Sequence, residues 1–178
     1  IMSGMEDLVV AGGVEMMSYV AAEGIPTPLD AHNVDLRNRH PQTNVGIAAD
    51  IIATQEGFSR LELDAFSAES QRRAGLAMQA GAFAKSLIPV YRPDGTLALD
   101  NEEFPRPQTT AESLAKLQPV FGNFMDLPFY DSGMTFRQMV AKHWPGLDIE
   151  HVHHAGSSSG VVDGAGALDH ARRTASMM

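Results

Sequence analysis

The stretch "NVGIAADIIATQEGFSRLELDAFSAESQRRA", residues 44–74, decides the fold of this chain, because it predicts two consecutive helices. In its first part, apolar residues recur at helical spacing, which predicts one inward face. That face is expected to consist of Ile47, Ile51 and Ile52. Gly57 follows the pattern, and glycine is the residue that most readily closes a helix at its C-terminus. The sequence therefore predicts a short helix that begins near Gly46.

The second helix begins at "SRLE", Ser59–Glu62, which has the form of a capping box. In such a box the serine side chain accepts a backbone N–H, and the glutamate reaches back to the serine N–H. The helical pattern continues to about Ala80, just before Gly81. The apolar residues expected to share one face of this helix are Leu63, Phe66, Leu76 and Ala77.

Strands are predicted on either side of these helices. "LVVA", Leu8–Ala11, has the length and character of a buried strand and runs directly into two glycines. "LIPVY", Leu87–Tyr91, predicts another strand. We further expect an extended loop at 20–43, a short helix from Thr110 to about Leu117, and a helix at Thr135–His143. Strands that lead into glycine turns and helices are typical of the α/β class.

The composition disfavours several classes of function. With 22 acidic and 13 basic side chains the formal net charge is −9. Nucleic acid and anionic membranes are therefore not expected as partners, because neither is attracted to an acidic surface. No apolar run is long enough to cross a bilayer and no signal sequence opens the chain, so we expect a cytoplasmic protein. The absence of cysteine removes thiol nucleophiles, disulfides and thiolate metal ligands.

Four motifs, in their order along the chain, resemble those of the thiolases, which include acetyl-CoA acetyltransferases and 3-ketoacyl-CoA thiolases. "VVAGGVEMMS" is similar to the family's strand and glycine turn, and residues 44–74 are similar to the start of its loop domain. "RPQTTAESLAKLQPVF" resembles the family's Arg-Pro…Leu-Ala-Lys-Leu-x-Pro-x-Phe signature. "HHAGSSSGVVDGAGAL", residues 153–168, is similar to Thr-Ala-Gly-Asn-Ser-Ser-Gly-x-x-Asp-Gly-Ala-Ala-Ala. Each motif alone is weak evidence, but four in the right order are strong.

The resemblance implies a partial thiolase fold of the α/β class: a piece of the N-terminal αβα domain plus the inserted loop domain that binds coenzyme A (CoA). Residues 1–43 are expected to end the N-terminal domain and form an extended loop. Residues 44–153 would form the loop domain, and 154–178 would return to the N-terminal domain. Because "IMSG" at the start reads as the end of a helix, we expect the chain to be an internal fragment.

The activity implied by the resemblance is acyl transfer to or from CoA, by thiolytic cleavage of 3-ketoacyl-CoA or by condensation of acetyl-CoA. In this family a cysteine upstream of the matched region takes up the acyl group, and a histidine and a second cysteine near the C-terminus handle the proton. None of these lies in the matched segment, so we expect no catalytic residue and no activity from this chain alone. The alternative is a non-catalytic thiolase-like protein that binds CoA or acyl-CoA without turnover. CoA would be a substrate and not a permanent cofactor, and a homodimer or homotetramer is implied for the full-length protein.

The resemblance also assigns residues to CoA. Arg106 and Ser113 match positions near the adenine and phosphates, where a guanidinium can stack on a purine and pair with phosphate. Positions that the family places beside the pantetheine arm are Ala155, Ser159 and Gly160. Glycine there would let the backbone approach the ligand, although a flexible Gly/Ser linker is the alternative interpretation. Asn44 and Val45 are candidates for pocket lining, and a helix-entry role suits Asn44 equally well.

Two further features have structural interpretations. The histidines of "HVHH" include His151 and His153, which would face the same side of an extended segment, as a metal site requires. No third ligand is evident beside them or His154, and the family needs no metal, so we predict no metal site. Asp163 is expected to be a structural cap or turn residue and not a catalyst.

Two segments depart from the family pattern. Residues 122–150 form an insertion where many thiolases have a short turn, which indicates a less typical subgroup. After Leu168 the family continues with an apolar strand, whereas this chain continues with "DHARRTASMM". A buried central strand does not tolerate such charge. We therefore expect residues 169–178 to reflect a frame error or a truncated gene end.

Overall fold

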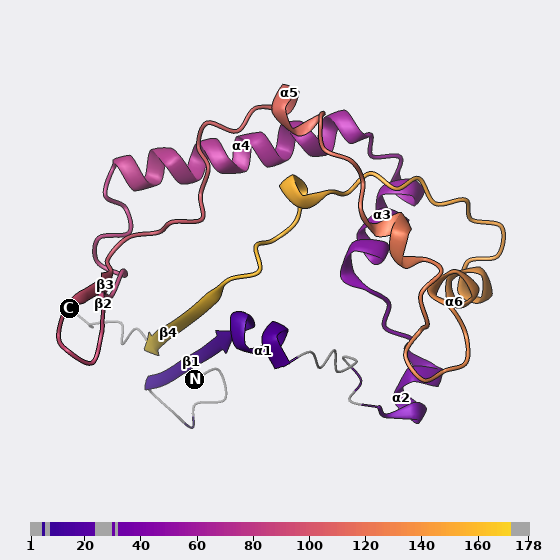
Figure 1. Ribbon diagram of the computed structural model, residues 1–178, viewed down its shortest axis with the longest axis horizontal. Helices are drawn as coiled ribbons and strands as arrows, with labels where there is room; N and C mark the ends of the chain where they lie inside the picture. Colours follow the sequence, from indigo (N-terminus) through magenta and orange to yellow (C-terminus); the bar gives the residue numbers. More distant parts are fainter. Residues whose placement is uncertain (1–4, 6–7, 24–29, 31, 172–178) are drawn as a thin grey trace, which may run out of the picture. The chain divides into compact units, whose positions relative to one another are not determined.

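The computed structural model describes residues 5, 8–23, 30 and 32–171 (Figure 1). The chain divides into two compact units. The first, which we call the terminal unit, combines Ile1–Thr27 with Gly160–Met178. The second, the central unit, is Pro28–Ser159. The helix end expected at "IMSG" lies outside the described residues, as do residues 172–178 of the segment 169–178 in which a frame error is expected.

The terminal unit is a two-stranded antiparallel ladder followed by a short helix. β1 (Leu8–Met16) pairs with β4 (Asp163–Ala171), and α1 (Met17–Glu23) follows β1 directly. Asp163 accepts hydrogen bonds from the backbone N–H and the hydroxyl of Ser18, at 2.9 and 2.7 Å. The prediction that Asp163 is a structural cap is therefore confirmed.

The prediction of a short buried strand at Leu8–Ala11 is wrong in both length and burial. β1 continues through the two glycines to Met16, and every position along it is exposed. Val10 and Val14, for example, are 69% and 73% exposed. The pairing also continues past Leu168 to Ala171, so the polar residues after Leu168 do not end the strand. Asp169 is tolerated there because its side chain is exposed.

The first two predicted helices are both present in the central unit. α3 (Val45–Glu56) ends at Gly57, whose backbone is left-handed with φ of 73°. α4 (Arg60–Gln79) begins with the expected capping box: the Ser59 N–H donates to the Glu62 carboxylate at 2.9 Å, and the Glu62 N–H donates to the Ser59 hydroxyl at 3.3 Å. Local backbone chemistry therefore sets both helix boundaries as the sequence predicts.

The inward faces of these helices differ from the expectation. Ile47 and Ile51 are buried, but Ile52 is 56% exposed. On α4, Phe66 is 76% exposed and Leu76 is half exposed, so the predicted apolar face of that helix is wrong. The residues that α4 buries are Asp64 and Gly75. The reason is that α4 packs through hydrogen bonds and close backbone approach: a Cβ at Gly75 would collide with the ring of Pro107.

The remaining elements of the central unit are short. They are α2 (Val34–Arg39), β2 (Val90–Tyr91), β3 (Leu97–Leu99), α5 (Ala111–Leu114), the 3₁₀ turn η1 (Phe121–Phe124), α6 (Phe136–His143) and the 3₁₀ turn η2 (Ala155–Ser157). Thr110 and Thr135 cap α5 and α6 as expected. The loop predicted at 20–43 is wrong, because α2 lies within it and Asn33 caps that helix by accepting the Leu36 N–H at 2.9 Å. The strand predicted from Leu87 begins only at Val90.

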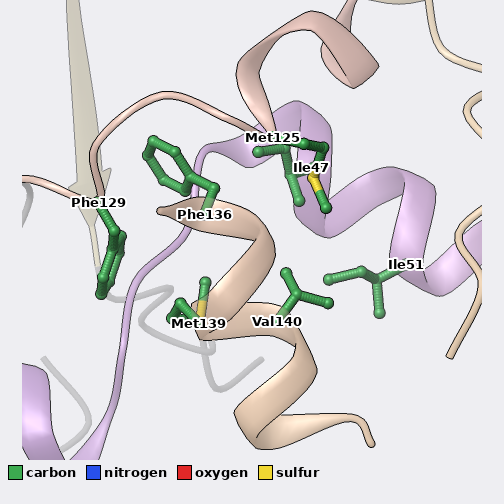
Figure 2. Packing of buried hydrophobic residues seen from close by; sticks show 7 residues of the cluster. All are labelled: Ile47, Ile51, Met125, Phe129, Phe136, Met139 and Val140. Carbon is green, nitrogen blue, oxygen red and sulfur yellow. The ribbon is translucent and has the colours of Figure 1, made fainter. Parts of the chain in front are cut away.

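The hydrophobic core of the central unit lies between α3 and the insertion (Figure 2). Its buried members are Ile47, Ile51, Met125, Phe129, Phe136, Met139 and Val140. All but the two isoleucines come from the insertion, residues 122–150. η1 packs equally closely, since the ring of Phe121 occupies the space that a side chain at Gly46 would need. The insertion is therefore an integral part of the core and not an appended loop.

A buried arginine links α2 to the insertion. Arg37 is only 6% exposed and donates to the Asp30 carboxylate at 2.6 and 2.8 Å. It also pairs with Asp131, and its guanidinium lies 5.4 Å from the ring centroid of Tyr130. Hydrogen bonds from Arg37 hold the pKa of Asp30 below its usual value. The buried guanidinium charge is thereby compensated by two carboxylates, those of Asp30 and Asp131.

Candidate functional site

The clearest candidate site is a shallow hollow between α4 and η2, which we call the α4–η2 groove. Its lining consists of Phe66, Ser67, Ser70, Gln71, Gly156, Ser157 and Ser158, and its volume is about 180 Å³. Phe66 contributes an exposed aromatic surface, whereas most of the other side chains offer hydroxyl or amide groups. Such a mixture suits a ligand with both amide groups and apolar segments.

His154 holds the η2 side of the groove in place. Its ring is fully buried, with Nε2 2.7 Å from Asp64 Oδ1. The Gly156 N–H donates to Nδ1 at 3.0 Å, and the Ser158 hydroxyl donates to the His154 carbonyl at 2.8 Å. The turn at Ala155–Ser157 is therefore ordered by several hydrogen bonds. A flexible linker does not describe this segment.

Asp64 and Arg60 connect this histidine to α5. The Nε of Arg60 lies 3.0 Å from both carboxylate oxygens of Asp64. Nη2 of the same arginine donates to the carbonyls of Leu114 and Leu117, at 2.7 and 2.8 Å. A side chain at Gly156 would collide with Leu114, so the turn packs directly on α5. The groove is thus built on a fixed frame of α4, α5 and η2.

Arg106 lies beside the groove through its backbone. Its N–H donates to the Gln71 side-chain oxygen at 2.7 Å, and Gln71 lines the groove. Pro107, the next residue, packs on Gly75 one turn further along α4. The side chain of Arg106 is exposed.

The other predicted CoA contacts fall in different places. Ala155 is exposed in η2, and Ser159 is exposed next to the groove residue Ser158. Gly160 begins the terminal unit and is not part of the groove lining. The Ser113 hydroxyl accepts the Thr110 N–H at 3.1 Å and donates to the Thr110 carbonyl at 2.7 Å. Ser113 therefore acts in the capping of α5 and does not line the groove.

Asn44 and Val45 stand at the start of α3. The Asn44 side chain accepts the Gly46 N–H at 2.9 Å and so caps the helix. Val45 is exposed, and neither residue lines the α4–η2 groove. The helix-entry interpretation of Asn44 is confirmed.

The other two histidines of "HVHH" anchor the segment before η2 to α3. His151 Nδ1 and His153 Nδ1 each lie 2.7 Å from the fully buried Asp50 carboxylate. The backbone N–H groups of Val152 and His153 donate to it at 3.1 and 3.0 Å. Burial alone would raise the pKa of Asp50, but these four hydrogen bonds outweigh it and hold the pKa below its usual value. Within the described ranges, no group of three or more His, Cys, Asp or Glu side chains is arranged to hold a metal ion.

Sequence reasoning missed the two buried carboxylates and a second hollow. Asp50 and Asp64 are polar residues at positions that the helices bury, and this was the available signal. The second hollow lies in and beside the insertion, with a volume of about 220 Å³. Its walls include Met125, Val140 and Trp144. Of the residues singled out in the sequence, His151 lines it.

Comparison with known proteins shows relatives of one kind. A family model, the N-terminal domain of thiolase, matches residues 1–124. The chain is 32% identical over 183 residues to an acetyl-CoA acetyltransferase of Chromobacterium violaceum, covering 94% of this chain and 40% of that protein. It is 35% identical over 183 residues to a beta-ketoadipyl-CoA thiolase of Pseudomonas aeruginosa, covering 93% of this chain and 39% of that protein.

Solved structures of thiolases also match this chain. The dimeric peroxisomal thiolase of Saccharomyces cerevisiae matches with a TM-score of 0.67 and 27% identity, over 96% of this chain and 38% of that one. Human mitochondrial 3-ketoacyl-CoA thiolase in complex with CoA matches with a TM-score of 0.61 and 29% identity, over 94% and 38%. The chain belongs to the thiolase family and has a partial thiolase fold of the α/β class. It spans about 40% of the length of the curated relatives named above. None of the described helices has the length and apolar character needed to span a membrane.

Proposed function

We propose that this chain is the CoA-facing part of a thiolase that transfers acyl groups to or from CoA. The observation that carries the proposal is the α4–η2 groove, with the backbone of Arg106 bound to one of its lining residues. Hydroxyl groups at Ser157 and Ser158 can pair with the amides of a pantetheine arm. The exposed guanidinium of Arg106 can bind phosphate or stack on adenine. Of the named structural neighbours, the human mitochondrial enzyme was solved with CoA.

The chemistry itself would belong to a longer protein. Thiolysis needs a thiolate that attacks the 3-keto carbonyl and holds the acyl group as a thioester. The bond between C2 and C3 breaks, the C2 fragment takes up a proton and leaves as acetyl-CoA, and the thiol of a second CoA then accepts the acyl group. The 178 residues include no cysteine, so this chain carries no nucleophile for that step. We assign it CoA recognition and no catalytic residue. CoA and acyl-CoA are then substrates.

We infer individual contacts from the resemblance together with the positions of these residues. We assign the adenine and phosphate end to Arg106, and the pantetheine arm to the turn that includes Ala155, with Ser159 and Gly160 after it. Ser113 has the weaker case, because it does not line the groove. We keep the domain limits expected for a thiolase, with the loop domain at 44–153. A homo-oligomer is also proposed, and the yeast neighbour is described as dimeric.

Calorimetric titration of the chain with CoA tests the proposal. Arg106→Ala should weaken CoA binding about tenfold or more, because it removes a hydrogen bond to a charged group. Arg137→Ala on α6 is the matched control, since it removes the same charge from an arginine that pairs with Asp126 away from the groove. An affinity that Arg106→Ala leaves unchanged would reject the assignment of that residue.

The alternative, a non-catalytic thiolase-like protein that binds CoA, is distinguished by the gene. Sequencing the regions on both sides of the coding segment should reveal a cysteine codon upstream of Ile1. A natural gene without such a cysteine would rule out thiolysis and leave CoA binding as the function.

A cytoplasmic location stays a prediction from the sequence, and cell fractionation tests it.

A further inference from the structure

We propose that His154 is a positioning residue that shapes the α4–η2 groove by holding one neutral tautomer. This inference rests on the proposed function, because it concerns the surface that would meet CoA. Nothing in the motif comparison assigns a role to this position. In the family motif that residues 153–168 resemble, a threonine falls at the position of His154.

Both ring nitrogens of His154 are engaged, and their partners fix the proton. Nδ1 faces the Gly156 N–H, which donates to it at 3.0 Å, so Nδ1 must be the acceptor. Nε2 lies 2.7 Å from Asp64 Oδ1 and therefore carries the hydrogen and donates. A proton on Nδ1 would face the Gly156 N–H and remove that bond. Only the neutral Nε2–H tautomer satisfies both contacts in this fully buried ring.

The groove hydroxyls are tied to the same residue. The His154 N–H donates to the Ser157 hydroxyl at 3.0 Å, and the His154 carbonyl accepts from the Ser158 hydroxyl at 2.8 Å. The positions of both serines therefore depend on where His154 sits. Asp64 holds the imidazole and Arg60 holds Asp64, so the Nε2 contact fixes the ring on α4 and contributes chiefly to stability. The Nδ1 contact with Gly156 shapes the turn itself. A threonine side chain in this position has no imidazole nitrogen and is too short to reach Asp64.

Two substitutions separate the two ring contacts. His154→Asn places an amide oxygen near the position of Nδ1 and keeps an acceptor for Gly156, but it is too short to reach Asp64. His154→Gln places an amide nitrogen near the position of Nε2 and keeps a donor to Asp64, but it loses the acceptor. If the histidine shapes the turn, CoA affinity and stability should respond in opposite order in the two variants.

The experiment combines calorimetric CoA titration with thermal unfolding of the 178-residue chain. We expect His154→Gln to keep the higher melting temperature and to lose about tenfold in CoA affinity, the equivalent of one hydrogen bond. His154→Asn should melt earlier and bind CoA within about threefold of the unsubstituted chain. An affinity that simply follows the melting temperature in both variants would mean a structural role only and overturn the inference.

A second measurement does not depend on CoA. Long-range ¹⁵N–¹H NMR spectra of the unsubstituted chain should show the Nε2–H tautomer for His154 and a Gly156 amide shift that changes in His154→Gln. Detection of the Nδ1–H tautomer would contradict the inference even if CoA binds. If the unsubstituted chain does not bind CoA, the proposed function fails in this chain, while the NMR spectra still decide whether His154 holds the turn.

Discussion

The two units of this chain show two ways of arranging the same kinds of residue. The central unit has a continuous core between α3 and the insertion, and buried carboxylates join its distant segments. The terminal unit has an extensive backbone ladder, yet β1 presents exposed valines along its length. Backbone pairing alone therefore does not make a stable unit, because a two-stranded ladder without a covered face is marginal in water. We therefore expect the central unit to be more stable than the terminal unit.

Amide hydrogen exchange should show the largest contrast. Amides of Ile51 and Met139 lie in helices whose side chains form the core, and they should exchange only through unfolding of the central unit. Amides of β1 near Val10 should exchange roughly 1,000-fold faster, because opening the ladder exposes no core. The measurement is exchange followed by NMR. Equal protection in both units would contradict the comparison.

Removal of a core ring from the insertion should have the next largest effect. Phe129 is 1% exposed and packs against Phe136 with ring centroids 5.3 Å apart. Phe129→Ala should lower the free energy of unfolding by about 3–5 kcal/mol, through lost contacts and a cavity. Denaturant unfolding measures it. Phe83→Ala is the matched control, because Phe83 is 40% exposed and its loss should cost about 1 kcal/mol or less.

A small loss from Phe129→Ala would show that the insertion is dispensable to the core. The control makes the result specific, since both variants delete the same atoms. In that event the central unit would depend chiefly on its buried carboxylates and their hydrogen bonds. Substitution of Asp50 should then have the larger effect on stability.

Asp50→Asn tests the hydrogen bonds of a buried carboxylate. The amide presents an N–H group toward one of the two imidazoles that now donate to the carboxylate, so one buried contact is lost. We expect a loss of about 2–4 kcal/mol at neutral pH. The exposed Asp100 offers the control Asp100→Asn, which should change little.

The same variant predicts a pH dependence. The folded pKa of Asp50 lies below its ordinary value of 3.8, so the folded chain binds fewer protons than the unfolded chain. The stability from its ionisation is present above pH 3.8 and is lost as the pH falls through the lower folded pKa. Melting temperature plotted against pH should therefore fall less steeply below pH 3.8 in Asp50→Asn than in the unsubstituted chain. Identical slopes would contradict this assignment.

The sequence predicts the helix boundaries well, and the physical reason is local. Capping at Ser59 and closure at Gly57 need only the few residues around them, and both are observed. Which face of a helix is buried depends on the segment packed against it. Phe66 and Asp64 illustrate this, because the sequence places the aromatic ring inside and the structure buries the carboxylate. No local pattern shows that His154, 90 residues away, is the partner of Asp64.

The candidate site was predictable in part for a similar reason. The motifs that resemble thiolases indicate Arg106 and the turn at Ala155, and the structure places both next to α4. Asp64 and His154, which hold the turn, lie within two of these motifs, but neither motif shows that the two residues are bonded to each other. His151 and His153 share a face in the sequence as metal ligands would, although no metal site is predicted there. In the structure their imidazoles, and that of His154, each lie against a buried carboxylate.

The smallest expected effect concerns Asp163 in the terminal unit. Its carboxylate accepts two hydrogen bonds from Ser18 in the first turn of α1, and these bonds lower its pKa. Both partners are exposed to solvent, so Asp163→Ala should speed amide exchange at Ser18 about threefold or less. The melting temperature of the central unit should not change, because the core cluster belongs to the central unit and Asp163 to the terminal unit. A lower melting temperature would show that the ladder supports the core, and the stability of the two units would then have to be treated as one cooperative transition.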